Sequence, residues 1–213
     1  MALIRSKNHL LVIKLLLHVT CLTPAVWMFW LGATDMLGAD PVKALIHFYG
    51  IGSIHCLFAT LAVSPAIRWT KTPALLQVRR MLGLYAAFYA SMHIICFVVF
   101  EWQLQWLEIG KEIIKRPYIT VGMVTWVLLA ILSFTSFKRA QRALGKRWGQ
   151  VHALVYPLLV LALVHFYWSQ KSPLNEAILY GMLGVSLLAW RQNKLFIWFE
   201  FFRSSKHTKT MHR

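Results

Sequence analysis

The chain has 213 residues, of which 58% are hydrophobic, and a formal net charge of +16. This apolar content exceeds the roughly 45–50% of ordinary soluble domains, which excludes a typical soluble fold. Nucleic-acid binding is not indicated, because the basic residues are concentrated in alternate loops between apolar segments. The three cysteines lie inside apolar runs and form no CxxC pair, so neither a disulfide framework nor a zinc site is expected.

Six long apolar runs follow one another along the chain, at about 10–31, 44–66, 81–100, 117–137, 150–169 and 174–199. Each has roughly the 20 residues that a helix needs to cross the hydrocarbon layer. We therefore predict an all-α integral membrane protein with one six-helix transmembrane domain at residues 10–199. A cytoplasmic N-terminal segment at 1–9 precedes it, and a basic cytoplasmic tail at 200–213 follows it. We expect the first run to be a retained helix, because Lys14 interrupts it and no small-residue cleavage site follows.

The distribution of charge predicts the orientation of these helices. The N-terminal residues up to Lys14, the loops at 67–80 and 138–147 and the C-terminal residues from Arg191 onward together hold 18 of the 23 Lys and Arg residues. Six of the seven acidic residues fall on the opposite side. By the positive-inside rule, both termini are expected in the cytoplasm, where the basic residues also face anionic lipid headgroups.

Histidines are the unusual residues of the apolar runs, because almost no acidic residues accompany them at membrane depth. They are His18, His47, His55, His93, His152 and His165. Intramembrane ionisable residues are functional candidates by default. A proton relay normally combines histidines with carboxylates, whereas neutral imidazoles alone suit a metal, and haem iron fits between packed helices. We favour His93, His152 and His165 as ligands; His18 and His55 are more simply explained by hydrogen bonds to a neighbouring helix, and His47 suits either role.

Depth divides the three favoured histidines between two levels. At about 1.5 Å per residue, His93 falls in the outer half of its helix, and His165 lies near the outer end of the fifth run, so these two are expected to pair. His152 lies near the inner end of the fifth run, and the sequence does not determine its partner ligand; His18 is the nearest histidine in depth. Thirteen residues separate His152 from His165, about 140° apart on an ideal helix, and Pro157 between them can kink it. The sequence therefore supports one haem level more firmly than two.

Seven stretches along nearly the whole chain resemble the MsrQ family, formerly called YedZ, which belongs to the wider ferric-reductase-like transmembrane group. They are LGADPVK at 37–43, HFYG at 47–50, RRMLGL at 79–84, SMH at 91–93, GKEIIKRPYITVG at 110–122, LGKRWGQVHALVY at 144–156 and HFYW at 165–168. The tail and parts of 101–109 are not distinctive, and His55 does not match a family feature.

This resemblance implies a haem-binding electron-transfer subunit in the bacterial inner membrane. Such proteins bind b-type haem, here one or two, and pass electrons to a periplasmic molybdenum-cofactor subunit, MsrP, which reduces methionine sulfoxide in oxidised envelope proteins. The electrons would come from the quinone pool, or from a cytosolic flavin reductase through bound flavin mononucleotide (FMN). The family histidines fall on His93, His152 and His165. Sulfoxide chemistry itself is expected on the partner subunit.

Haem propionates need cationic donors, and basic residues stand at both ends of the predicted helices. Arg116 is the first candidate at the outer mouth, and Arg79 or Arg80 at the inner mouth, although topology and headgroup contact explain each of them equally well.

Two other functions remain open. A stand-alone ferric-reductase-like protein would append a cytosolic flavin and nicotinamide domain, whereas fourteen residues without a glycine-rich loop follow Phe199, so we expect a borrowed electron donor. A non-redox transporter or scaffold would need paired polar residues at mid-depth or broken helices, for which Pro157 alone is weak support.

Overall fold

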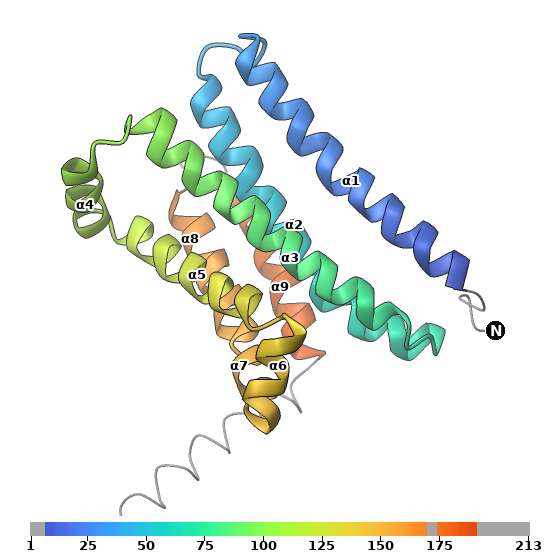
Figure 1. The fold of residues 1–213 in the computed structure, drawn as a ribbon. Helices are drawn as coiled ribbons and strands as arrows, with labels where there is room; N and C mark the ends of the chain where they lie inside the picture. Colours follow the sequence, from blue (N-terminus) through green and yellow to red (C-terminus); the bar gives the residue numbers. More distant parts are fainter. Residues whose placement is uncertain (1–6, 170–173, 191–213) are drawn as a thin grey trace, which may run out of the picture.

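The computed structural model describes residues 7–169 and 174–190, and all regular structure in this part of the chain is helical (Figure 1). In chain order, its elements are α1 (Lys7–Ala33), α2 (Pro41–Thr70), α3 (Leu75–Cys96), the π-helical turn η1 (Phe97–Glu101), α4 (Trp106–Lys115), α5 (Pro117–Phe134), α6 (Lys138–Leu144), the 3₁₀ turn η2 (Gly145–Arg147), α7 (Trp148–His152), α8 (Val155–Ser169) and α9 (Leu174–Ala189). The predicted tail at 200–213, most of the segment at 1–9 and the end of the sixth run lie outside the described residues.

Four of the described helical segments are long and apolar enough to cross a membrane: α1, α2, α3 with its continuation η1, and α5. The two arms at 138–152 and 155–169 pass the same test together, and they add a fifth candidate span when the bent pair is counted as one. Helix α9 is apolar but shorter. The prediction of an all-helical, multi-pass membrane protein is therefore confirmed, whereas six complete spans and cytoplasmic termini stay predictions.

The predicted kink at Pro157 is present as a break between α7 and α8. The two arms meet at an angle of 46° across residues 153–154. Proline has no N–H group to bond the carbonyl four residues earlier, and its ring crowds that carbonyl. In this chain that carbonyl belongs to Ala153, and it accepts a hydrogen bond from the N–H of Tyr156 at 3.1 Å instead. The bend places His152 and His165 in different helices.

Local sequence signals explain where the two helices that flank the site begin. Asp40 caps α2, because its side chain accepts a hydrogen bond from the N–H of Lys43 at 3.1 Å, and Pro41 follows at the first helical position. Hydrogen bonds from Lys43 also hold the pKa of Asp40 below its usual value. Pro117 likewise occupies the first position of α5, directly after the extended residue Arg116.

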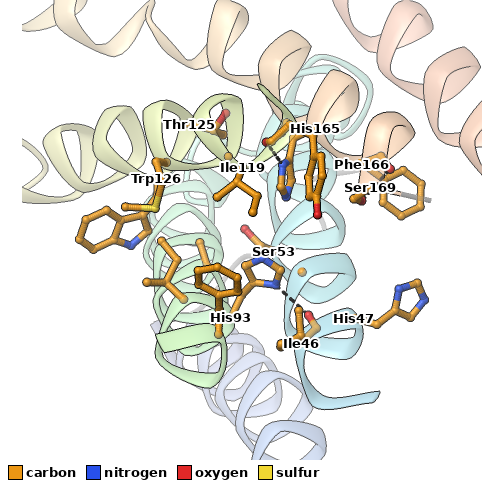
Figure 2. Close-up of a pocket in the computed structure, with 18 of the residues that line it drawn as sticks. Ile46, His47, Ser53, His93, Ile119, Thr125, Trp126, His165, Phe166 and Ser169 are labelled. Atoms are coloured by element: carbon orange, nitrogen blue, oxygen red, sulfur yellow. Dashed lines mark hydrogen bonds between the residues drawn. The ribbon is translucent and has the colours of Figure 1, made fainter. Parts of the chain in front are cut away.

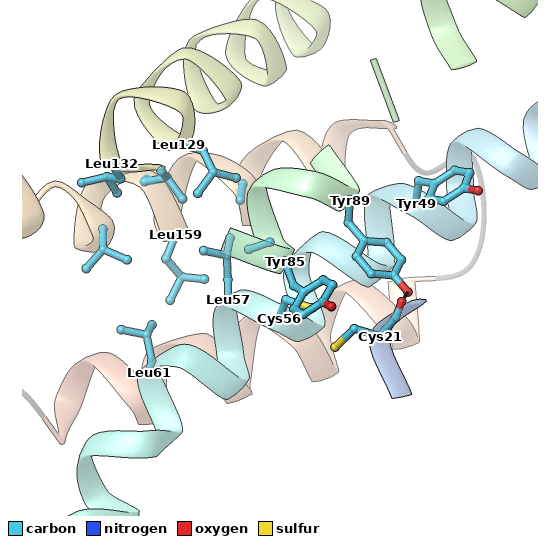
Figure 3. Packing of buried hydrophobic residues seen from close by; sticks show 14 of the residues in the cluster. Cys21, Tyr49, Cys56, Leu57, Leu61, Tyr85, Tyr89, Leu129, Leu132 and Leu159 are labelled. Carbon is cyan, nitrogen blue, oxygen red and sulfur yellow. Dashed lines mark hydrogen bonds between the residues drawn. The ribbon is translucent and has the colours of Figure 1, made fainter. Parts of the chain in front are cut away.

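Two antiparallel helix pairs, α2–α3 and α5–α8, form the centre of the bundle (Figure 1). The first pair packs closely because Gly52 has no side chain; a Cβ atom there would collide with the ring of Tyr89. Leucines from both pairs interdigitate between them (Figure 3). The labelled ones are Leu57, Leu61, Leu129, Leu132 and Leu159. This apolar layer separates two regions of the bundle, which are called outer and inner after the orientation predicted from the charge distribution.

Helix α1 lies at the edge of the bundle and contacts it through apolar packing and through a stripe of hydrogen bonds. The imidazole of His18 is hydrogen-bonded to the hydroxyl of Tyr85. The hydroxyl of Tyr89 donates to the carbonyl of Cys21 at 2.7 Å, and that of Tyr49 donates to the carbonyl of Ala25 at 2.8 Å. Other α1 side chains are exposed on the surface of the bundle, where lipid would surround them: Leu11, Leu15, Val19, Val26 and Trp30. Since lipid supplies no hydrophobic force between helices, these hydrogen bonds add to the packing that attaches α1.

Replacing Tyr89 with phenylalanine should loosen α1 without creating a cavity. We expect Tyr89→Phe to lower the free energy of unfolding by about 0.6–1.7 kcal/mol, the range measured for hydrogen bonds between membrane helices. Unfolding in mixed detergent micelles measures this. Tyr167→Phe is the matched control, because Tyr167 is exposed; equal losses in the two variants would contradict the attachment.

Candidate functional site

Two imidazoles face each other in the outer half of the bundle. His93 comes from α3 and His165 from α8, and Figure 2 shows the two rings pointing toward one another. Their centres are 6.1 Å apart and their planes cross at 89°. Both rings line a cavity of about 490 Å³ between α2, α3, α5 and α8. The structure thus brings together the pair that depth along the sequence predicts.

Each ring is oriented by a backbone carbonyl of the neighbouring helix. The Nδ1–H of His93 donates to the carbonyl of Ile46 at 2.8 Å, and the Nδ1–H of His165 donates to the carbonyl of Tyr118 at 2.6 Å. A carbonyl can only accept, so Nδ1 carries the proton in both rings and Nε2 keeps its lone pair. This is how proteins commonly orient metal-binding histidines, with the second nitrogen free for the metal.

The spacing of the rings suits one metal ion bound between them. A metal–imidazole bond is about 2.0–2.1 Å and the ring centre lies about 1.1 Å beyond the nitrogen, so two opposed ligands have centres roughly 6.3 Å apart. The observed 6.1 Å is close to this distance. Within the described residues, no group of three or more His, Cys, Asp or Glu side chains could hold a metal ion. Two facing imidazoles with free Nε2 atoms are a ligand set that suits haem iron.

Charged residues gather at the outer mouth of this cavity. Arg116, predicted there, lines it together with Lys43, Glu101 and Glu112. Arg116 forms an ion pair with Glu112 and donates to the hydroxyl of Tyr118 at 3.2 Å, and this hydrogen bond raises the pKa of Arg116. Lys43 and the buried Glu112 were not predicted as site residues. The motifs LGADPVK and GKEIIKRPYITVG, which contain them, were the available signal.

The other outer and middle histidines are not part of the facing pair. His47 lines the same cavity, but its ring lies to one side, away from His93 and His165 (Figure 2). His18 is hydrogen-bonded to Tyr85 and lines neither this cavity nor the second cavity described below. The ring of His55 stacks on Tyr180 of α9 and bonds its hydroxyl at 2.6 Å. Hydrogen bonding between helices, the simpler explanation for His18 and His55, agrees with these contacts.

A second cavity, of about 880 Å³, lies in the inner half of the bundle. His152, Arg79 and Arg80 all line it, so the structure brings the predicted inner residues together. The His152 ring packs on Trp148, with centres 4.2 Å apart, and its Nε2 lies 3.2 Å from the hydroxyl of Thr135. Among the described residues that line this cavity, His152 is the only histidine. The structure therefore offers it no second imidazole.

Comparison with known proteins agrees with the motifs. The family described as "Ferric reductase like transmembrane component" matches residues 49–163. "Protein-methionine-sulfoxide reductase heme-binding subunit MsrQ" of Klebsiella pneumoniae is 40% identical over 192 residues, covering 90% of this chain and 95% of the relative. The proteins of the same name from Xanthomonas oryzae and Cronobacter sakazakii are 40% and 39% identical, over 88% and 87% of this chain and 88% and 94% of theirs. No solved structure matches. The chain therefore belongs to the MsrQ family, within the ferric-reductase-like transmembrane group.

Proposed function

We propose that this chain is the haem-binding electron-transfer subunit of a methionine sulfoxide reductase system in the bacterial inner membrane. The observation that carries the proposal is the facing pair His93 and His165, 6.1 Å apart with both Nδ1 atoms bonded to carbonyls. The names of the relatives support haem as the cofactor and methionine sulfoxide reduction as the system it serves.

In this proposal, His93 and His165 would hold a b-type haem through their Nε2 atoms. When bound, the haem would supply one-electron chemistry. The carbonyls of Ile46 and Tyr118 make the imidazoles better electron donors to iron and keep them oriented. Apolar walls that include Leu57 and Leu129 would surround the haem.

The inner cavity is proposed to hold the group that receives electrons first. His152 offers one metal ligand there, and Arg79 and Arg80 offer positive charge for a propionate or a phosphate. A second haem carries propionates and FMN carries a phosphate, and either would take electrons from quinone or a cytosolic flavin reductase. The third alternative is a quinone that binds in this cavity and passes electrons directly to the outer haem. Two redox groups at these levels would carry electrons through the layer that excludes ions.

The direction of transfer follows from the charge distribution. With both termini in the cytoplasm, the His93–His165 cavity faces the periplasm, and its electrons leave toward a periplasmic molybdenum-cofactor subunit, MsrP-like, where the sulfoxide is reduced. This chain then moves electrons and the partner carries out the oxygen-atom chemistry. The exposed charged mouth, with Lys43 and Arg116, lies on the side where that partner would bind.

The first test is a haem count on purified protein, with the spectrum of the dithionite-reduced minus the oxidised form. At least one b-type haem per chain is expected. Two would identify the inner group as a second haem; one would leave the inner cavity to FMN or quinone, which extraction and fluorescence would detect. Colourless protein made with ample haem would refute the redox proposal and favour a transporter or scaffold. Reduction of ferric chelates without any partner would favour the stand-alone ferric-reductase-like function.

Single substitutions of the histidines should separate the two levels. We expect His93→Ala and His165→Ala to remove the outer haem and stop electron delivery, because each substitution removes one of the two facing imidazoles. His152→Ala should spare most of the outer-haem signal, because it lies in the other cavity. His55→Ala is the control, since His55 bonds Tyr180 outside both cavities. Pyridine haemochrome content is the measurement, and unchanged haem in both His93→Ala and His165→Ala would refute the assignment.

Removing positive charge at the outer mouth should weaken haem binding. We expect Arg116→Gln to raise the haem dissociation constant about three- to tenfold, a modest effect because this side chain is half exposed and already paired with Glu112. Haem titration of detergent-purified apoprotein measures the change. Lys111→Gln is the matched control, because Lys111 pairs with Glu108 on α4 and does not line the cavity. An equal effect of the two substitutions would show that only general charge matters.

A further inference from the structure

The two halves of the outer site repeat one another along the chain. His93 and its acceptor Ile46 are 47 residues apart, and His165 and its acceptor Tyr118 are also 47 residues apart. Each feature of the second half therefore follows its counterpart by 72 residues, from Ile46 to Tyr118 and from His93 to His165. Helices α2 and α3 make the first half, and α5 and α8 make the second.

The same spacing runs through the wall of the cavity. Each lining residue between 46 and 97 has a counterpart 72 positions later that also lines the cavity. The pairs are Ile46/Tyr118, His47/Ile119, Gly50/Gly122, Ile51/Met123, Ser53/Thr125, Ile54/Trp126, Leu57/Leu129, Ala90/Ala162, His93/His165, Ile94/Phe166 and Phe97/Ser169. Most side chains differ within a pair, whereas the histidine, glycine, leucine and alanine pairs are identical. The lining residues outside the pattern are Lys43, Glu101, Trp102, Glu112 and Arg116, which include the charges of the mouth.

The paired glycines lie against the paired imidazoles. A Cβ atom on Gly50 would be 3.0 Å from Nδ1 of His93, and one on Gly122 would be 2.7 Å from Cε1 and 2.8 Å from Nδ1 of His165. Each glycine stands four residues after the acceptor carbonyl, on the same face of its helix. Each ring therefore donates to a carbonyl and packs against the glycine backbone one helical turn later.

We propose that Gly50 and Gly122 are positioning residues, each completing a cradle that sets the rotation of one imidazole. The proposal rests on the haem ligation proposed above. A histidine ring turns readily about its Cβ–Cγ bond, because that torsion has broad energy wells. The carbonyl fixes where Nδ1 points, and the glycine lets the ring approach the helix closely enough to reach it. The two cradles together hold the ring planes crossed, at 89°.

Crossed axial imidazoles have a spectroscopic consequence. In ferric low-spin haem, parallel imidazole planes split two of the iron d orbitals and give a rhombic electron paramagnetic resonance (EPR) spectrum. Perpendicular planes leave these orbitals nearly degenerate, and the spectrum is dominated by one feature at a large g value. The outer haem should therefore show the large-g form. A residue that only helps helices to pack would not alter this signal.

The experiment compares Gly50→Ala, Gly122→Ala and a control glycine in the full-length ferric protein. Gly181→Ala on α9 is the control, because nothing lies within 4 Å of a Cβ atom there. We expect the native protein and the control to show the large-g signal. Gly122→Ala should shift or abolish it and weaken haem binding about tenfold, since the added methyl group overlaps the ring. Gly50→Ala should shift the signal less, because its contact is longer.

Thermal melts of the haem-free proteins accompany the spectra, so that loss of fold is recognised. Changed EPR with unchanged apoprotein melts supports the cradles. Native spectra in both alanine variants, a rhombic signal in the native protein, or loss of fold in both variants would each overturn the positioning role. If Gly122→Ala alone fails to fold, Gly50→Ala decides the matter. Each of these outcomes concerns only the positioning of the rings and does not contradict haem binding by the native protein. A native protein without haem would instead refute the proposed function.

Discussion

Everything at the outer site depends on two hydrogen bonds from imidazole nitrogen to backbone carbonyl. An N–H group in a membrane interior has no water to bond, so it must find a protein acceptor. A carbonyl inside a helix can serve, because one lone pair takes the helical N–H and the other remains available. Ile46 and Tyr118 supply this second lone pair without breaking their helices. The same contact that satisfies each ring also aims its other nitrogen at the space between the helices.

The inner half of the bundle is built differently from the outer half. The 72-residue spacing that matches His93 to His165 matches Arg80 to His152, so the counterpart of the inner imidazole is a guanidinium, whereas the two outer counterparts are both imidazoles. The break before Pro157 also turns α7 away from the axis of α8. Two redox groups bound at these levels would therefore have different ligands, different charge and different exposure. Those differences are the means by which a protein sets unlike potentials for successive carriers.

Much of this arrangement could be predicted from the sequence, because depth in a membrane follows directly from residue number. Four of the six apolar runs correspond to α1, α2, α3 and α5, and the depths counted along the sequence put His93 at the level of His165. Arg116 was predicted at the mouth for the same reason, whereas the break near Pro157 was predicted because proline lacks an N–H group. Other features depend on how each helix is rotated about its axis and on which residues of other helices face it, and these could not be predicted. They are the acceptor carbonyls, the glycine contacts, and the side chains of Lys43 and Glu112 at the mouth. A helical pattern predicts the depth of a side chain in the membrane far better than it predicts which residues that side chain contacts.

Each imidazole takes its acceptor from the other helix of its own pair, His93 from α2 and His165 from α5. Membrane helices insert first and associate afterwards, and partners adjacent in the chain meet soonest. Each hairpin can therefore orient its ligand before the two hairpins come together. A metal bound by both would then join two halves whose ligands are already oriented, as a late cross-link in the biogenesis of the protein.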